Sequence, residues 1–136
     1  MLVLDASLTI ASILRDETTD AAQAIMRRVV EEGAHVPSLW RLEVANVLRN
    51  AVRRGRCDVA FVDQALNDLA AFPITIDSQT DAQAWGATSA LSRAEDLTLY
   101  DAAYLELAIR LEATLVTVDK ALVTAGRRRR LDILTA

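Results

Sequence analysis

Two patterns of apolar residues alternate along the chain. Short runs of apolar and β-branched residues are separated by longer segments in which apolar residues recur every three or four positions. The short runs are typical of buried strands, and the longer period is typical of helices that bury one face. The first pattern predicts strands at Leu2–Leu4, Ala34–Val36, Ile74–Ile76, Thr114–Val118 and Asp132–Leu134. The second predicts helices over Ser7 to about Arg15, Asp20–Glu32, Leu39 to about Arg53, Asp58 to about Ala71, about Thr80 to Ser92 and Thr98 to about Leu111, with a short helix before the last strand.

The order of these elements predicts the fold class. Strands that are apolar throughout and alternate with helices indicate a mostly parallel sheet with both faces covered. We therefore expect a three-layer α/β/α sandwich. It should form a single domain over residues 1–136, because 136 residues is an ordinary length for one domain. Ser38, Asp58 and Thr98 begin predicted helices and are expected to cap them.

Composition excludes several classes of protein. Hydrophobic residues make up 52% of the chain and charged residues 25%, which is ordinary for a globular domain. Cys57 is the only cysteine, so neither an internal disulfide nor a zinc site built on cysteines can form. Ser–His–Asp catalysis would depend on His35, the only histidine. No apolar run approaches the roughly 18 residues of a membrane-spanning helix, and the first residues do not resemble an export signal. We therefore expect a cytoplasmic protein with no membrane partner.

Charge is distributed unevenly. The chain has 15 Lys and Arg against 19 Asp and Glu, a net charge of −4, which argues against a uniformly basic coat for nucleic acid. Arginines nevertheless cluster within Arg49–Arg56 and again at Arg127–Arg130. Arginine is the forked donor suited to phosphate and carboxylate, so local contacts with RNA or an acidic partner are possible. Arg49 and Arg53 are four apart on the predicted helix 39–53 and are candidate RNA contacts. The alternative is that all these arginines are simply solvated.

Four acidic residues are candidates for a common site. Asp5 and Asp119 each follow a predicted strand, and parallel strands end at the edge of a sheet where ligands bind. Glu43 lies beside the apolar stripe of its helix, and Asp101 lies in the first turn of another. Each has an ordinary alternative: an N-cap for the strand-end aspartates, solvation for Glu43, and a favourable dipole interaction for Asp101. Asp96 stands in a more polar stretch and is expected at the surface.

Converging carboxylates require a cation. Two unit charges about 4 Å apart repel by roughly 4 kcal/mol at an effective dielectric near 20. Because the donors would all be oxygen, the ion expected is Mg²⁺, with Mn²⁺ as a substitute. Such a site suits phosphate chemistry, because the ion polarises the phosphoryl oxygen and lowers the pKa of a bound water.

Four segments carry a family resemblance: Asp5-Ala6-Ser7, Glu43-Val44-Ala45-Asn46-Val47-Leu48, Leu99-Tyr100-Asp101-Ala102-Ala103-Tyr104-Leu105-Glu106-Leu107-Ala108 and Leu115-Val116-Thr117-Val118-Asp119. Together, and in this order, they resemble the PIN-domain family, and within it the VapC-type toxins of bacterial toxin–antitoxin pairs. The resemblance implies a Mg²⁺-dependent endoribonuclease with a small α/β/α fold. It implies a metal-binding, catalytic quartet of Asp5, Glu43, Asp101 and Asp119, with supporting polar positions at Ser7, Asn46 and Thr117. It also implies a homodimer, and inhibition by a VapB-type antitoxin that covers the active site.

Two other classes of protein stay open at this point. A phosphoryl-accepting receiver or haloacid-type phosphatase also places aspartates at strand ends. A receiver would need an acidic pair after the first strand and a lysine following a late strand, whereas Asp5 is followed by Ala6-Ser7 and Lys120 comes directly after Asp119. A phosphatase of that type would need a second aspartate two residues after the first, where this chain has Ser7. The second alternative is a non-enzymatic binding module in which the acids are only helix caps.

Overall fold

The computed structural model describes the whole chain, residues 1–136, and places an entirely parallel, five-stranded sheet at its centre. The strands are β1 (Leu2–Leu4), β2 (Ala34–Val36), β3 (Ile74–Ile76), β4 (Thr114–Val116) and β5 (Ile133–Leu134), in the spatial order β3-β2-β1-β4-β5. The central strand is β1, where Val3 lies beside His35 of β2 and Leu115 of β4. The parallel sheet predicted from the apolar strands is therefore confirmed.

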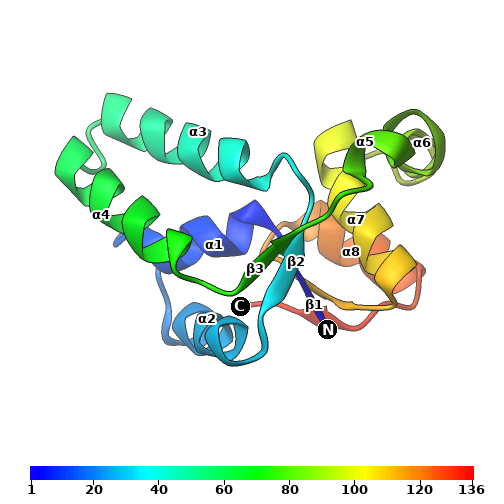
Figure 1. The fold of residues 1–136 in the computed structure, drawn as a ribbon, viewed down its shortest axis with the longest axis horizontal. Helices are drawn as coiled ribbons and strands as arrows, with labels where there is room; N and C mark the ends of the chain where they lie inside the picture. Colours follow the sequence, from blue (N-terminus) through cyan, green and yellow to red (C-terminus); the bar gives the residue numbers. More distant parts are fainter.

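Helices cover both faces of this sheet (Figure 1). One layer contains α1 (Ala6–Ile13), α2 (Asp20–Glu32), α3 (Trp40–Arg53) and α4 (Val59–Ala70). The other contains α5 (Thr80–Gln83), α6 (Ser89–Glu95), α7 (Leu99–Leu111) and α8 (Lys120–Arg128). The chain fills the first layer while it moves from β1 outward to β3, and fills the second after it crosses to β4, as right-handed crossovers require. The three-layer α/β/α architecture is confirmed.

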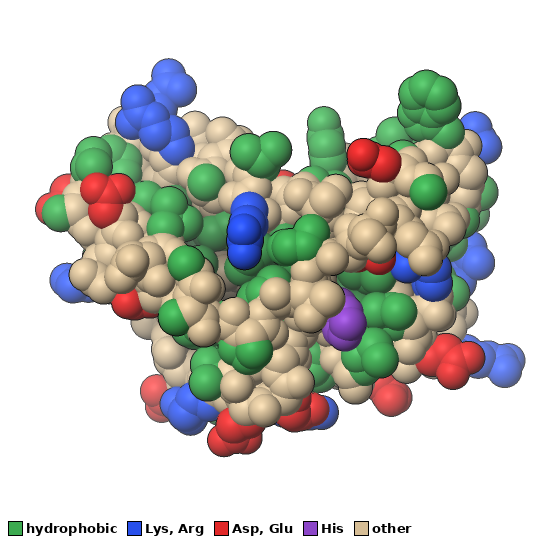
Figure 2. Space-filling view, in the orientation of Figure 1, with side chains coloured by type: hydrophobic (Ala, Val, Ile, Leu, Met, Phe, Trp, Pro, Cys, Tyr) green, Lys and Arg blue, Asp and Glu red, His purple; other side chains and the backbone are tan.

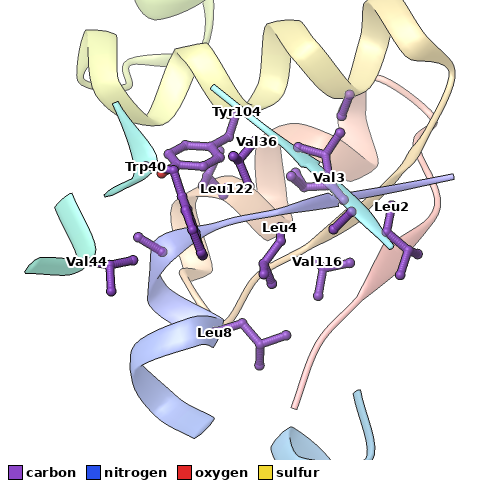
Figure 3. Packing of buried hydrophobic residues seen from close by; sticks show 14 of the residues in the cluster. Leu2, Val3, Leu4, Leu8, Val36, Trp40, Val44, Tyr104, Val116 and Leu122 are labelled. Carbon is purple, nitrogen blue, oxygen red and sulfur yellow. The ribbon is translucent and has the colours of Figure 1, made fainter. Parts of the chain in front are cut away.

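One apolar cluster joins the sheet to both helical layers. Figure 3 shows Leu4 and Val116 of neighbouring strands in this cluster, with Leu8, Trp40 and Tyr104 contributed by three different helices. Every residue from Ala102 to Ala108 in α7 is buried, which marks α7 as the central helix of its layer rather than a surface helix. Burying a side chain the size of leucine stabilises the fold by about 1.5–3 kcal/mol, so this cluster fixes α3 and α7 firmly against the sheet.

The predicted helix over residues 80–92 is wrong in its continuity. The structure has α5, then a π-helical segment η1 (Ala84–Thr88), then α6, which runs on to Glu95. Gly86 within η1 adopts φ −106° and ψ −105°, which interrupts the helical path. Glycine lacks the Cβ atom that restricts other residues to helical angles, so the pattern of apolar residues continues through a kink that it does not reveal.

Two smaller predictions also differ from the structure. β4 ends at Val116 rather than Val118, because Thr117 and Val118 turn into the loop that leads to α8. Ser38 does not cap α3, whose N-cap position is Leu39 without a side-chain cap. The Ser38 backbone N–H donates instead to Thr80 Oγ1. Asp58 and Thr98 cap their helices as predicted, accepting from Phe61 N and Asp101 N.

The topology brings several functional candidates to one edge. β1 and β4 are adjacent and parallel, so the residues that follow them emerge on the same side of the sheet. The first turn of α7 returns to that side, since the helix that precedes a parallel strand runs antiparallel to it. Separately, the structure contains no helix that is both long enough and apolar enough to cross a bilayer.

Candidate active site

Asp5 is the most deeply buried acid of the four. It follows β1 directly and is only 4% exposed. It occupies the N-cap position of α1, but its side chain makes no capping hydrogen bond to that helix. Burial raises the pKa of Asp5, while hydrogen bonds from Ser7 and Thr117 oppose this rise. Helix capping therefore does not explain why a carboxyl group is placed here, and the non-enzymatic alternative loses one of its supports.

Two hydroxyl groups hold the Asp5 carboxylate. Its Oδ2 atom accepts hydrogen bonds from Ser7 Oγ at 2.5 Å and from Thr117 Oγ1 at 2.8 Å. The same hydroxyls accept in turn from the loop after β4, Ser7 Oγ from Val118 N and Thr117 Oγ1 from Asp119 N. The network joins residues more than 100 positions apart in sequence and fixes the Asp119 backbone relative to Asp5. The supporting positions implied for Ser7 and Thr117 are thus placed beside the acid.

Glu43 projects from α3 towards the opposite helical layer. Its Oε1 atom accepts a hydrogen bond of 2.5 Å from the phenol of Tyr104, a fully buried residue of α7. Burial raises the pKa of Glu43, the bond from Tyr104 lowers it, and the charge of Asp5 raises it further. Sequence reasoning missed Tyr104, which resembles an ordinary core residue. The available signal was chemical, because a buried tyrosine almost always gives its hydroxyl a partner.

Asp101 is the acid whose pKa responds to all three of the others. It lies half-buried in the first turn of α7, where its backbone N–H donates to Thr98 Oγ1 at 3.1 Å. Burial raises the pKa of Asp101 to about 6, with further contributions from the negative charges of Asp119, Asp5 and Glu43. The four residues come from four different helices or loops. The fold therefore brings Asp119, Asp5 and Glu43 close enough to Asp101 for their charges to oppose its ionisation.

Asp119 has two roles in the structure, one as a helix cap and one as a member of the acidic cluster. Its Oδ1 atom accepts from Leu122 N at 3.0 Å and caps α8. This confirms the alternative that its sequence position left open, but Oδ2 takes no part in the cap. Because Asp119 also raises the pKa values of Asp5 and Asp101, one carboxylate both caps α8 and contributes to the acidic cluster.

The oxygen atoms of these four carboxylates are suited to a hard divalent cation. No three acidic, histidine or cysteine side chains lie close enough together to hold a metal ion in common. Mg²⁺ usually binds proteins through one or two carboxylates and keeps several of its waters. The four carboxylates therefore fit Mg²⁺ by their chemistry and by their uncompensated negative charge, without a closed cage of protein ligands.

The metal-free protein should lose stability as the pH rises from about 4 to 6. Asp101 has an ordinary pKa of 3.8 when unfolded and about 6 when folded, so in this range the folded chain binds more protons than the unfolded chain. The free energy of unfolding therefore falls as the pH rises through this window. Melting temperatures measured in chelator across the window should decline more steeply for the wild type than for Asp101→Asn. Parallel profiles for the two proteins would contradict the shifted pKa.

The remaining polar candidates lie outside the acidic network. Asn46 is exposed on α3, and its supporting role stays a prediction. Asp96 is exposed, as predicted, at the C-terminal end of α6.

The two arginine clusters divide into paired and unpaired residues. Arg49 and Arg53 are exposed on α3, and neither takes part in any ion pair of the structure. Arg56, in contrast, binds Asp16 and Glu17. In the second cluster Arg128 and Arg129 both bind Glu95 and so tie α8 to α6. Arg56, Arg128 and Arg129 are thus paired with acids at the surface, whereas RNA contact by Arg49 and Arg53 stays a prediction.

The chain is similar to several known proteins. Residues 2–127 match the model of the PIN domain family. The chain is 34% identical over 125 residues to a protein named Ribonuclease VapC3 from Mycobacterium tuberculosis, covering 90% of this chain and 85% of the relative. It is 31% identical over 121 residues to a Ribonuclease VapC3 from Pyrobaculum aerophilum, covering 89% and 91%.

Two solved structures share the fold. The crystal structure of PAE2754 from Pyrobaculum aerophilum superposes with a TM-score of 0.70 at 24% identity, covering 97% of this chain and 81% of that one. The crystal structure of VapBC2 from Rickettsia felis bound to a DNA fragment from its promoter gives a TM-score of 0.62 at 14% identity, covering 99% and 98%.

Proposed function

The chain belongs to the PIN-domain family as a VapC-type member, and from this premise we propose that it is a Mg²⁺-dependent endoribonuclease. The observation that carries the proposal is the placement of Asp5, Glu43 and Asp119 around Asp101, where burial and then the charges of these three acids raise the pKa of Asp101. No lysine or arginine is paired with any of the four. A cluster of acids without a counter-ion from the protein is a site that a metal ion completes.

One or two carboxylates of this cluster would bind the ion directly, and hydrogen bonds within the chain would hold those carboxylates in place. Asp5 is fixed by two hydroxyls and Glu43 by the Tyr104 phenol, so neither has to be reoriented when an ion binds. The Asp119 backbone is tied to the same hydroxyls. When bound, Mg²⁺, or Mn²⁺ in its place, would neutralise charge on a phosphodiester and supply a water of lowered pKa for attack on phosphorus. The protein's contribution is to preorganise the oxygen ligands at one edge of the sheet.

A toxin role and its partners belong to the same proposal. The curated relatives are named as VapC ribonucleases, and a structural neighbour is a VapBC complex. We infer that this chain acts as the toxin of a VapBC-type pair, with RNA as its substrate, a VapB-type antitoxin as its inhibitor, and a homodimer as its working form. The receiver and phosphatase alternatives have no comparable support, because the family model that matches is the PIN domain and the curated relatives are named as ribonucleases.

Expression in a bacterial host without an antitoxin tests the proposed function. Induction of the wild-type chain should arrest growth and degrade a subset of cellular RNA, because an active endoribonuclease acts on the host's transcripts. Asp101→Asn, expressed to the same level, should do neither. Equal toxicity of the two proteins would show that growth arrest does not arise from the acidic site.

Arg49 and Arg53 should contribute to RNA affinity more than to chemistry. Both lie on α3 beyond Glu43 and have no acidic partner, so they can bind phosphates that lead away from the acids. Arg49→Ala plus Arg53→Ala should weaken RNA binding and flatten its salt dependence by about 0.7 per lost phosphate contact on a single strand. Cleavage by saturated enzyme should change less than affinity.

The affinity is measured against salt concentration in an Asp101→Asn background, which prevents cleavage. Arg27→Ala plus Arg93→Ala removes the same charge from exposed, unpaired positions elsewhere and serves as the matched control. An unchanged slope in the α3 double variant would mean that these arginines do not touch the RNA backbone.

A further inference from the structure

An exposed apolar residue precedes each of the two helical acids. Leu42, directly before Glu43, is 77% exposed, and Tyr100, directly before Asp101, is 63% exposed. Single exposed apolar residues are normal on a protein surface. Here, however, one of them stands beside a candidate ligand on α3 and the other beside a candidate ligand on α7. Figure 1 shows these two helices on opposite sides of the molecule's upper face.

The helix geometry places the Tyr100 ring at the rim of the acidic site. Tyr100 and Tyr104 are four residues apart, so they lie one above the other on the same face of α7. Tyr104 is buried and donates to Glu43, which shows that this face is directed at α3. Side chains on a helix lean towards its N-terminus. Tyr100 therefore lies one turn before Tyr104 on this face, at the N-terminal end of α7, where its ring is open to solvent.

Nothing in the protein uses the Tyr100 ring. Its hydroxyl makes no hydrogen bond, and most of its surface is open, whereas the Tyr104 ring is enclosed. Figure 2 shows that hydrophobic side chains project from the surface over the helices of this layer. A flat aromatic face that is open to solvent within one residue of a candidate metal ligand is placed to contact whatever molecule the acids bind.

We propose that Tyr100 is a stacking platform for a base of single-stranded RNA, next to the phosphate that lies at the acids. The proposal rests on the proposed ribonuclease function. A phosphodiester held at Asp101 carries its neighbouring nucleoside past the residue before Asp101, and an unpaired base has a free face to stack. A base within a duplex is already stacked on its neighbours, so this contact selects single strands or loops.

The surrounding charges favour RNA over an apolar protein segment as the occupant. Arg49, seven residues beyond Leu42 on the same face of α3, is exposed and has no ion pair, so a cation lies on the helix face that carries Leu42. A phosphate would bind the metal ion at the acids and the unpaired arginine, and an aromatic base would stack on the flat Tyr100 ring. RNA carries both groups. Leu42 would border the same nucleotide from the α3 side.

Two probes of equal charge separate base stacking from backbone binding. One is an oligoadenylate of about twelve nucleotides, within the site sizes common for single-strand binding, and the other is an abasic ribose–phosphate oligomer of the same length. Affinities are measured in an Asp119→Asn background, so that binding is observed without cleavage. Tyr100→Ala should weaken oligoadenylate binding by about tenfold, because stacking on one aromatic ring contributes on that order. Its affinity for the abasic oligomer should not change.

Two further variants show whether the ring itself is responsible. Tyr100→Phe keeps the flat face and should bind both probes as the parent does. Val59→Ala removes an exposed apolar side chain at the start of α4 and should also have no effect. An equal loss of affinity for both probes in Tyr100→Ala would overturn the stacking proposal.

The outcome also distinguishes this inference from the proposed function. If the wild type cleaves RNA with Mg²⁺ but Tyr100→Ala retains full affinity for oligoadenylate, only the stacking proposal fails. If the wild type neither binds nor cleaves RNA, the proposed function fails first. If Tyr100→Ala instead dissociates a dimer in sedimentation without changing oligoadenylate affinity, the ring belongs to an interface between two copies, and the stacking proposal is wrong.

Discussion

Replacing Asp101 with asparagine should abolish RNA cleavage while leaving the fold intact. Burial raises the pKa of Asp101 to about 6, and the negative charges of Asp119, Asp5 and Glu43 contribute to the rise. The substitution removes a candidate metal ligand with almost no change in volume. We expect the rate of cleavage in Mg²⁺ to fall by more than the 10- to 100-fold that loss of an outer partner of a metal site costs. Without metal, removal of one like charge should leave stability unchanged or raise it.

The same loss of cleavage is expected for the other three acids, through Asp5→Asn, Glu43→Gln and Asp119→Asn. Asp96→Asn is the matched control, because Asp96 lies only five residues from Asp101 but is exposed at the end of α6. Its left-handed backbone conformation, with φ 52°, is one that asparagine tolerates well. Cleavage by purified Asp101→Asn at the rate of Asp96→Asn would show that the acidic cluster is not the catalytic site.

Mg²⁺ or Mn²⁺ should raise the melting temperature of the wild type. A ligand at about 100 times its dissociation constant adds roughly 2.7 kcal/mol to the free energy of unfolding. For a domain of this size that corresponds to about 5–15 °C when the site is saturated. The physical reason is that the ion relieves repulsion among four carboxylates that have no cationic partner in the protein.

The size of the metal-dependent shift in melting temperature should be compared between the wild type and variants of the acids. Asp5→Asn and Glu43→Gln should lose most of the metal-dependent shift, whereas Asp96→Asn should keep it. Equal shifts in all four proteins would mean that the ion stabilises the fold from some other place.

The sequence was sufficient to predict the sheet and the position of the acids. Asp5 and Asp119 follow apolar strands, and the parallel topology brings the ends of β1 and β4 together. The sequence was not sufficient to show which of these aspartates caps a helix and which does not. Asp119 does cap α8, whereas Asp5 makes no cap and binds Ser7 and Thr117 instead. This distinction depends on a partner 112 residues away, which local spacing cannot identify.

Tyr104 and the second arginine cluster illustrate the same limit. Periodicity assigns Tyr104 to the core, which is correct, but its bond to Glu43 joins α7 to α3 across 61 residues. Consecutive arginines at the end of α8 resemble a solvated run, yet Arg128 and Arg129 both bind Glu95. Periodicity identifies which face of an element is buried. It carries no information about which polar group that face meets.

RNA cleavage by the purified wild-type protein, assayed first in chelator and then with Mg²⁺ added back, tests the central claim most directly. If the carboxylates of Asp5, Glu43, Asp101 and Asp119 act by holding a metal ion, cleavage should be absent in chelator. It should return in proportion to the occupancy of the site as Mg²⁺ or Mn²⁺ is titrated. Undiminished cleavage in chelator, by protein shown to be free of metal, would contradict this account.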